Sequence, residues 1–156
     1  MGSRLKTDIA YIAGFLDGDG SVMLQLKRRN DTKTGYRFMA TVCFYQDARH
    51  EETLYWIRDT IGIGYISKRN DGMTELRVNG FKTVCSLLTE LQPYIRFKAL
   101  QTSALIEACS ILSTKQLSDI QKLRIVDLVL LIQNENYVTK RKKTREELLL
   151  GLNLTP

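Results

Sequence analysis

The hydrophobic period of this chain changes abruptly at Gly18-Asp19-Gly20. Before this point apolar residues recur at helical spacing and Asp8 is a candidate N-cap, so a helix is predicted over residues 9–18. Its inner face carries Ile9, Ile12, Ala13 and Leu16. After this point the period is two, which predicts a half-buried strand with inward Val22, Leu24 and Leu26. The chain therefore begins with a helix that is followed directly by a strand.

The order helix-strand-strand then recurs along the chain. Turn residues over 30–35 separate the first strand from a second one, whose inward residues are Phe38, Ala40, Val42 and Phe44. An Asn-Asp-Gly turn at 70–72 predicts a second hairpin, formed by strands over 65–69 and 74–78. Helices are predicted from Asp47 to about Ile61, from Asn79 to about Leu91, over 98–112 and 117–134, and from a Thr144/Glu147 capping box to about Gly151.

Antiparallel hairpins with helices on one face make an α+β domain. We therefore predict an αββαββα arrangement with a four-stranded antiparallel sheet and extra C-terminal helices. The 156 residues suffice for one domain with a sizeable core, spanning 1–156. Its core is expected over 8–133, and a basic tail with a short last helix over 134–156.

Charge and cysteine content narrow the function classes. Lys and Arg outnumber Asp and Glu by 23 to 17, and the net charge of +6 favours anionic partners, although solubility alone explains it equally well. Three widely spaced cysteines, Cys43, Cys85 and Cys109, argue against a disulfide scaffold or a zinc site. The sequence shows neither a membrane-spanning apolar run nor the apolar core of a signal peptide. We expect an intracellular protein that is not secreted and has no membrane partner.

The strand residues opposite the inward apolar set are polar and mostly basic. A solvated sheet face explains any one of them, but five of the eight are Lys or Arg. Gln, Arg and Lys are the side chains that pair with base edges in the DNA major groove, whose width of about 12 Å admits a strand ribbon. This face is therefore predicted to bind DNA through Gln25, Lys27, Arg29, Arg37, Ser67, Arg69, Glu75 and Arg77.

The tail adds a second basic feature, the run Lys140, Arg141, Lys142 and Lys143, which Arg145 extends. Such a run has no base-reading geometry of its own. It suits contacts to phosphates, which supply affinity and salt dependence rather than sequence choice.

The first helix contains residues that are unfavourable in a helix, both in its interior and at its C-terminus. Gly14 lies inside it, where Gly costs about 1 kcal/mol relative to Ala. Asp17 and Asp19 lie at its C-terminus, where the helix dipole disfavours negative charge, and segment 11–20 contains no Lys or Arg. A simple turn after a helix would also contain Asp and Gly. A calcium loop is not supported, because no further ligands follow at the required spacing.

Small residues on this helix would let a second helix approach closely. If that helix belongs to a second copy of the chain, a two-fold axis brings both helix ends together. Two Asp19 carboxylates would then repel each other unless a cation lay between them, and hard oxygen ligands suit Mg²⁺ better than zinc. The dimer interface is expected to include Ile12, Ala13, Gly14, Leu16 and Asp17.

The segment YIAGFLDGDGS at 11–21 resembles the LAGLIDADG motif of homing endonucleases, in the form typical of single-motif, homodimeric members. The resemblance continues with Gln46 after the second strand, IGIGY at 61–65 and LQPYIRFK at 91–98. It covers most of the chain, from about Asp8 to the basic tail. One motif copy implies two chains per active enzyme and the fold of that family.

The resemblance also implies roles for individual residues. Asp19 of each subunit would bind the metal together with the backbone carbonyl of Gly18, and Asp17 would hold the helix end. Gln46 and Lys98 match the positions that organise water and stabilise charge near the scissile phosphates. These last two roles rest on the resemblance alone, since the residues by themselves indicate only a strand-end amide and a surface lysine.

The implied function is that of an intron-encoded endonuclease which cuts both strands of a long pseudo-palindromic DNA site by metal-dependent phosphodiester hydrolysis. Mg²⁺ is the expected cofactor, with Mn²⁺ or Ca²⁺ able to replace it in binding. The expected partners are double-stranded DNA and a second copy of the chain, with the host genome in an archaeal cytoplasm or an organelle. Alternatives are a non-catalytic DNA- or RNA-binding module of the same fold (a regulator or splicing maturase) and a small metal-binding structural protein. The presence of Asp19, Gln46 and Lys98 together favours the nuclease.

Overall fold

The computed structural model describes residues 4–136 and 140–155, so residues 137–139 of the basic tail lie outside the described residues. The elements are α1 (Lys6–Asp19), β1 (Gly20–Arg28), β2 (Tyr36–Asp47), α2 (Glu52–Ile61), β3 (Tyr65–Lys68), β4 (Met73–Asn79), α3 (Phe81–Leu91), α4 (Ala99–Leu112), α5 (Asp119–Glu135) and α6 (Arg145–Gly151). Short 3-10 turns cover Ala48–His50 and Gln92–Tyr94. This order confirms the predicted α+β architecture. Within the described part of the chain, no helix combines the length and hydrophobicity needed to cross a bilayer.

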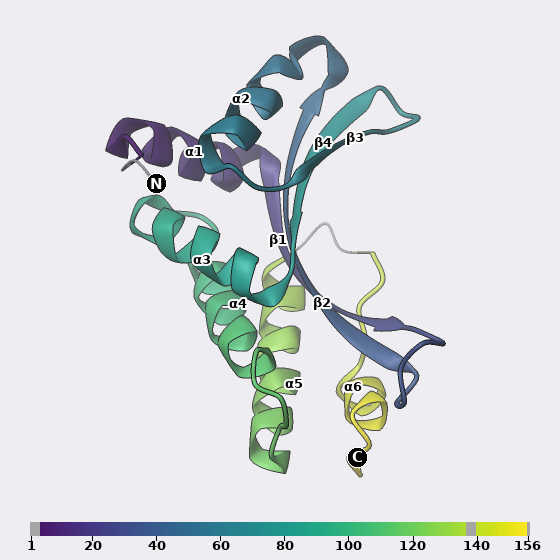
Figure 1. Ribbon diagram of the computed structural model, residues 1–156. Coiled ribbons are helices and arrows are strands. Elements are labelled where there is room, and N and C mark those ends of the chain that lie inside the picture. The colour runs from purple at the N-terminus through teal and green to yellow at the C-terminus, as the bar shows by residue number, and fades with distance from the viewer. Residues whose placement is uncertain (1–3, 137–139, 156) are drawn as a thin grey trace.

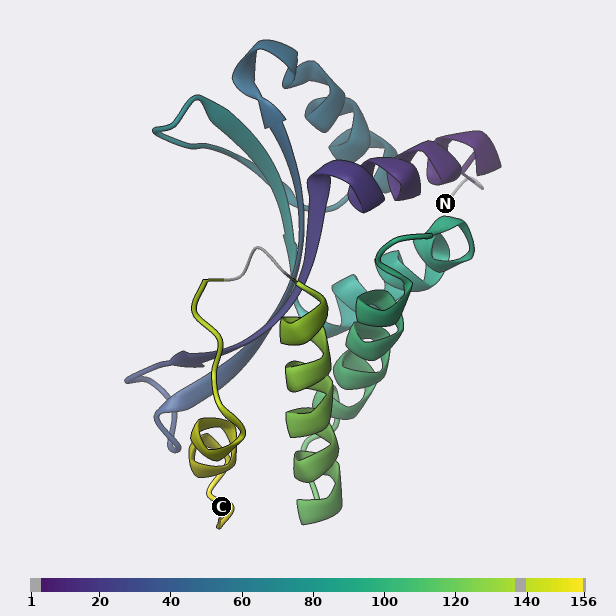
Figure 2. The same cartoon turned by 180° about the vertical axis from the view of Figure 1, so that it is seen from behind.

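The four strands form one antiparallel sheet in the order β1-β2-β4-β3. The sheet is strongly twisted and curved, and the described helices lie on its convex side (Figures 1 and 2). The last helix, α6, also packs on this side, because Gly151 lies against Leu26 and Tyr36. The concave side carries no helix among the described residues.

The buried core lies between the sheet and the helices. The strand register places Val22 opposite Val42, Leu24 opposite Ala40 and Leu26 opposite Phe38, and all six are buried. Phe44 and Leu76 continue this apolar layer across β2 and β4. The period-two pattern therefore identified the inward face of both hairpin strands correctly.

Three predicted N-caps are wrong. Leu5 is the N-cap position of α1, which places Asp8 in the first turn, where the helix dipole favours its negative charge. Asp47 caps the short turn Ala48–His50 by accepting from the Arg49 N–H, and α2 begins only at Glu52. Asn79 uses its side chain across the sheet instead, where its Oδ1 accepts from the Thr41 hydroxyl at 2.8 Å. Gly80, with φ 102°, takes the N-cap position of α3.

The junction between α1 and β1 leaves no room for a side chain. A Cβ on Gly20 would lie 2.8 Å from the carbonyl oxygen of Cys43 and 2.8 Å from that of Leu16. Both are backbone atoms and cannot swing away. The close approach lets β1 begin at the residue after α1 ends, so the helix end is fixed against β2.

We expect Gly20→Ala to lower the free energy of unfolding by about 1–3 kcal/mol, because overpacking against backbone forces the junction apart. Urea unfolding followed by circular dichroism measures this change. An unfolding free energy equal to that of the wild type would contradict the close contact at residue 20.

Candidate functional site

The end of α1 is held in place by the carboxylate of Asp17. This side chain is buried and accepts hydrogen bonds from three consecutive backbone N–H groups, those of Arg96 (2.6 Å), Phe97 (3.1 Å) and Lys98 (3.0 Å). The ammonium group of Lys98 also donates to the backbone carbonyl of Asp17. Asp17 thus joins the helix end to the segment before α4 and has a structural role.

Lys98 and Asp19 lie close together at this helix end. Burial lowers the pKa of Lys98, and the carboxylates of Asp17 and Asp19 oppose that shift by their negative charge. Asp19 is exposed and is the last residue of α1. The two side chains are therefore near enough to interact electrostatically where the helix meets the sheet, although they form no direct ion pair.

The donors here are hard oxygen atoms, which suit a divalent cation of the Mg²⁺ type. They are the carboxylate of Asp19 and the carbonyl of Gly18, one of the last helix carbonyls, which lack intrahelical partners. Among the described residues no group of three or more His, Cys, Asp or Glu side chains could hold a metal. The donor set fits such a cation only in part, so one chain supplies an incomplete site.

Gln46 lies near the same end. Gly20 pairs with Phe44, and Gln46 is two residues further along β2. Its Oε1 accepts from the N–H of Asp47 at 2.8 Å, which fixes the amide group. The structure thus brings Asp19, Lys98 and the strand end that carries Gln46 to one corner of the molecule.

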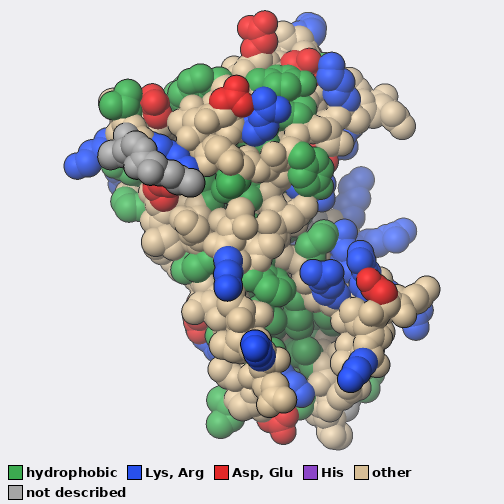
Figure 3. Space-filling model, in the orientation of Figure 1, with side chains coloured by type: hydrophobic (Ala, Val, Ile, Leu, Met, Phe, Trp, Pro, Cys, Tyr) green, Lys and Arg blue, Asp and Glu red, His purple; other side chains and the backbone are tan. Residues whose placement is uncertain are grey.

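On the concave side of the sheet, the strands carry six of the eight residues predicted to bind DNA, and the other two, Arg29 and Arg69, directly follow β1 and β3. Register places Lys27 opposite Arg37, and Ser67 opposite Glu75, with Arg77 beside it on β4. Gln25, Lys27 and Arg37 are exposed. Lys and Arg side chains gather on this side of the molecule (Figure 3).

The ends of this face differ from its middle. Arg29 and Arg69 lie just past the ends of β1 and β3, where they pair with Asp31 (3.2 Å) and Asp71 (2.7 Å). Among the described residues, Lys27 and Arg37 take part in no ion pair. The free positive charge of this face is therefore greatest around the β1–β2 hairpin.

The middle of this face is recessed and neutral, which the sequence did not indicate. Glu75 is only 8% exposed and accepts from Arg77 at 3.0 Å. Cys43 is fully buried although it belongs to this face, and burial raises the pKa of Cys43 and of Tyr45, so both remain uncharged at neutral pH. The concave curvature crowds these side chains together. The expectation of eight outward-facing side chains is corrected for Glu75.

The basic tail runs beside β1. Lys140, Arg141 and Lys142 are exposed, and Lys143 is half-buried. Arg145 does not extend this run, because it pairs with Asp127 on α5 at 2.6 Å.

The predicted dimer interface needs a second correction. Ile12, Ala13 and Leu16 have no exposed surface and Asp17 is 6% exposed, so these side chains belong to the core of a single chain. Gly14 alone of the five is exposed. Gly18 lies one turn further on, and an added Cβ at either glycine would meet nothing within 4 Å. The outer face of α1 is thus open and nearly free of side chains at these two points.

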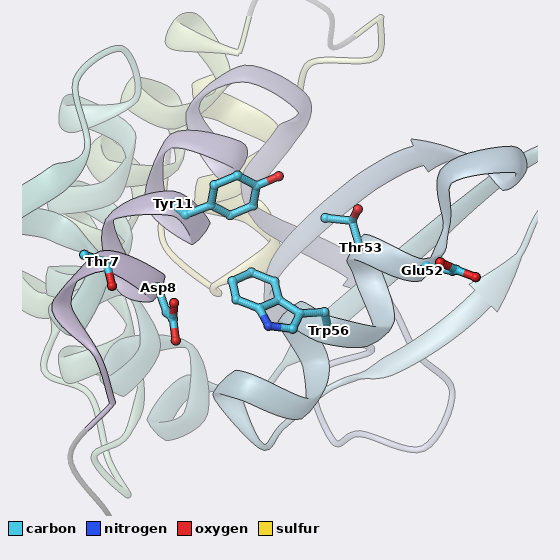
Figure 4. Close-up of a pocket in the computed structure, with 6 residues that line it drawn as sticks. All are labelled: Thr7, Asp8, Tyr11, Glu52, Thr53 and Trp56. Atoms are coloured by element: carbon cyan, nitrogen blue, oxygen red, sulfur yellow. The ribbon is translucent and has the colours of Figure 1, made fainter.

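Exposed aromatic residues surround this open face. Tyr11 is 54% exposed and Trp56 40% exposed, and their rings meet edge to face at 5.5 Å between α1 and α2 (Figure 4). They line a groove of about 660 Å³ with Thr7, Asp8, Glu52 and Thr53. Phe97, next to Lys98, is 84% exposed. Exposed aromatic side chains of this kind mark a contact surface. In the sequence, only the position of Tyr11 outside the inward stripe of α1 hinted at it.

Comparisons with known proteins agree with this geometry. The family model described as LAGLIDADG endonuclease matches residues 12–106. The chain is 32% identical over 98 residues to DNA endonuclease I-CvuI of Chlorella vulgaris, which covers 63% of this chain and 61% of that protein. It is 28% identical over 141 residues to DNA endonuclease I-CreI of Chlamydomonas reinhardtii, which covers 90% of this chain and 86% of that protein.

Two solved structures show the same fold. I-CvuI in complex with the I-CreI target superposes with a TM-score of 0.77 at 26% identity, over 95% of this chain and 94% of that chain. The archaeal intron-encoded homing endonuclease I-Vdi141I, complexed with DNA, gives a TM-score of 0.80 at 22% identity, over 94% and 95% of the two chains. At 22% identity, the second likeness concerns the fold alone.

We expect Asp17→Asn to lower the free energy of unfolding by about 2 kcal/mol, because it removes charge-assisted hydrogen bonds and sets an amide NH₂ against backbone donors. Chemical denaturation measures the decrease. Asp59→Asn is the matched control, since Asp59 is exposed and pairs only with its neighbour Arg58, and it should change stability by less than about 0.5 kcal/mol. Equal effects of the two substitutions would contradict the structural role of Asp17.

Proposed function

This chain belongs to the LAGLIDADG endonuclease family, and from that premise we propose that it is a site-specific homing endonuclease that cuts both strands of a long, roughly palindromic DNA site. One observation carries the proposal: the exposed Asp19 carboxylate and the Lys98 ammonium group, which donates to the Asp17 carbonyl, are both at the corner where α1 meets a concave basic sheet. The two curated relatives are named DNA endonucleases, and the I-CvuI structure contains an endonuclease target. Acting on genomic DNA would place the protein with its host genome.

The active form is a homodimer. Each chain has one motif copy, one Asp19 and one Gly18 carbonyl for a cation, so a second copy of the chain supplies the missing ligands. The open face of α1 at Gly14 and Gly18 allows two such helices to approach closely about a two-fold axis. Tyr11, Trp56 and Phe97 would then be covered by the partner, which explains their exposure in one chain.

The concave face would lie along the DNA major groove. Gln25, Lys27 and Arg37 are exposed at the hairpin end and would contact base edges or phosphates there. Arg29, Ser67, Arg69 and Arg77 follow the same face, with Glu75 orienting Arg77. Lys140, Arg141, Lys142 and Lys143 would contact phosphates beside the sheet.

Chemistry takes place at the paired helix ends. Asp19 and the Gly18 carbonyl would hold Mg²⁺, which supplies positive charge at the phosphate and makes bound water a better nucleophile. Lys98 places its ammonium group at this corner, where it offsets the negative charge that develops on the phosphate oxygens in the transition state. Gln46, its amide fixed by Asp47, orients water for in-line attack on phosphorus as the bond to the 3′ oxygen breaks.

A non-catalytic binding module of the same fold would need none of this arrangement at the helix end. No feature of the described residues favours that alternative over the nuclease. The same holds for a small metal-binding structural protein, since one chain offers only one carboxylate at the site.

We expect Asp19→Asn to reduce double-strand cleavage by about a hundredfold or more, because it removes the charged cation ligand. DNA binding should stay nearly unchanged. A target is first selected from a DNA library with the wild type. Cleavage of this target is then measured with and without Mg²⁺, and binding to it is measured in Ca²⁺. Asp59→Asn is the control and should cut at the wild-type rate. Normal cleavage by Asp19→Asn, or wild-type cleavage without a divalent cation, would contradict the assignment.

A separate prediction concerns the dimer. Gly14→Leu should leave the fold of one chain intact, because the position is exposed, but it should convert the dimer to monomers by holding the α1 helices apart. Analytical ultracentrifugation measures the change. Ser110→Leu, which adds the same side chain at an exposed position of α4, is the control and should remain dimeric. A Gly14→Leu dimer as stable as the wild type would show that the chains associate elsewhere.

A further inference from the structure

One glutamine near the end of α5 holds the basic tail by both atoms of its amide group. The Nε2 of Gln133 donates to the backbone carbonyl of Lys143 at 3.1 Å, and its Oε1 accepts from the N–H of the same residue at 2.9 Å. A two-point contact of this kind fixes the position and the orientation of a peptide group. Gln133 is only partly buried, and its side chain makes no other hydrogen bond among the described residues.

The start of the same segment is also held. The Nδ2 of Asn136 donates to the carbonyl of Val22 on β1 at 2.8 Å, and β1 is an edge strand of the sheet. Beyond Lys143, the Thr144/Glu147 capping box and the buried Leu148 anchor α6. Asn136 and Lys143 are therefore both attached to the folded core.

The charges of this segment remain available. Among the described residues, Lys140, Arg141 and Lys142 take part in no ion pair, in contrast to Arg145, which pairs with Asp127. Arg141 and Lys143 share a groove of about 160 Å³ with Gln25 and Lys27 of β1. The segment is thus set directly beside the strand face proposed to contact DNA.

We propose that Gln133 is a positioning residue that sets the basic segment 140–143 on the DNA backbone beside β1. The proposal rests on the proposed function, because it requires that this face binds DNA. Both polar atoms of the Gln133 amide are already engaged by Lys143, so its role would be to hold the segment. Without its two hydrogen bonds, the segment would adopt many conformations in the free protein, and binding would then have to order it at the expense of affinity.

The test uses Gln133→Met, which keeps the length of the side chain and removes both hydrogen bonds. Binding of the full chain to a random-sequence DNA duplex is measured over a range of salt concentrations. We expect affinity to fall about fivefold. The slope of log K against log salt should become shallower by about 0.9 for each phosphate that the segment no longer neutralises. The control is Gln116→Met, at an exposed position just before the start of α5, which should have the wild-type affinity and the wild-type salt slope.

A double-mutant cycle separates positioning from a general effect on the fold. Lys140, Arg141, Lys142 and Lys143 are replaced by Gln in the wild type and in Gln133→Met. If Gln133 acts through these charges, Gln133→Met has no further effect in the neutralised background. An equal decrease of affinity in both backgrounds overturns the proposal. If Gln133→Met lowers the melting temperature, the cycle is repeated with Gln133→Asn, a neutral amide whose side chain is one methylene shorter and cannot make both hydrogen bonds to Lys143.

The outcomes distinguish this proposal from the function on which it rests. A wild type that shows no salt-dependent binding to duplex DNA would overturn the DNA-binding function itself. A wild type that binds with a steep salt slope, together with wild-type affinity and slope for Gln133→Met, would overturn only the positioning role of Gln133.

Discussion

The carboxylate of Asp17 is the constraint on which the rest of the site depends. By accepting from three successive N–H groups, it fixes the segment that carries Phe97 and Lys98 to the end of α1. The contact of Gly20 with the backbone of Cys43 fixes the same helix end to the sheet. The proposed cleavage site, the proposed dimer face of α1 and the strand face are thus joined in one structural unit. A small movement at residue 17 would displace all three together, and catalysis tolerates little misplacement.

This rigid corner also explains why one chain is insufficient. The inner side of α1 is wholly used by the core, through Ile12, Ala13 and Leu16. Its outer side has glycines where a second backbone fits, and it ends in a single carboxylate beside a single lysine. In the proposed dimer, two-fold symmetry would double both at the axis, so that a cation ligand set and a helix contact would form in the same step. Association and assembly of the cleavage site would then be one event.

Sequence periodicity was sufficient for the architecture, because alternation along β1 and β2 and helical spacing along α1 reflect burial directly. Periodicity did not predict the contacts of polar side chains that bond to residues far away in the sequence. Asn79 carries the signature of an N-cap, yet its amide bonds to Thr41 on a neighbouring strand, which no local pattern reveals. Glu75 alternates as an outward residue, but the curvature of the sheet buries it against Arg77. Gln46 and Lys98 were found only by family resemblance, since each is an ordinary residue until the fold brings it to α1. Four of the five dimer residues, all but Gly14, were misassigned because one helix has two faces, and the apolar stripe belonged to the core.

In the proposed binding mode, the centre and the edges of the concave face would contribute differently to DNA binding, because their charges differ. Its centre is desolvated most completely when DNA docks, and removing an unpaired charge from water there would cost several kcal/mol. In the structure Glu75 and Arg77 are already paired at the centre, and Cys43 and Tyr45 are neutral, so this cost is reduced before DNA arrives. The free charges lie at the hairpin end and on the tail, where water remains and where attraction to phosphates acts over a longer range. In this binding mode, affinity and its salt dependence would therefore originate mainly at the edges of the face, and sequence choice would depend on hydrogen bonds made at its neutral centre.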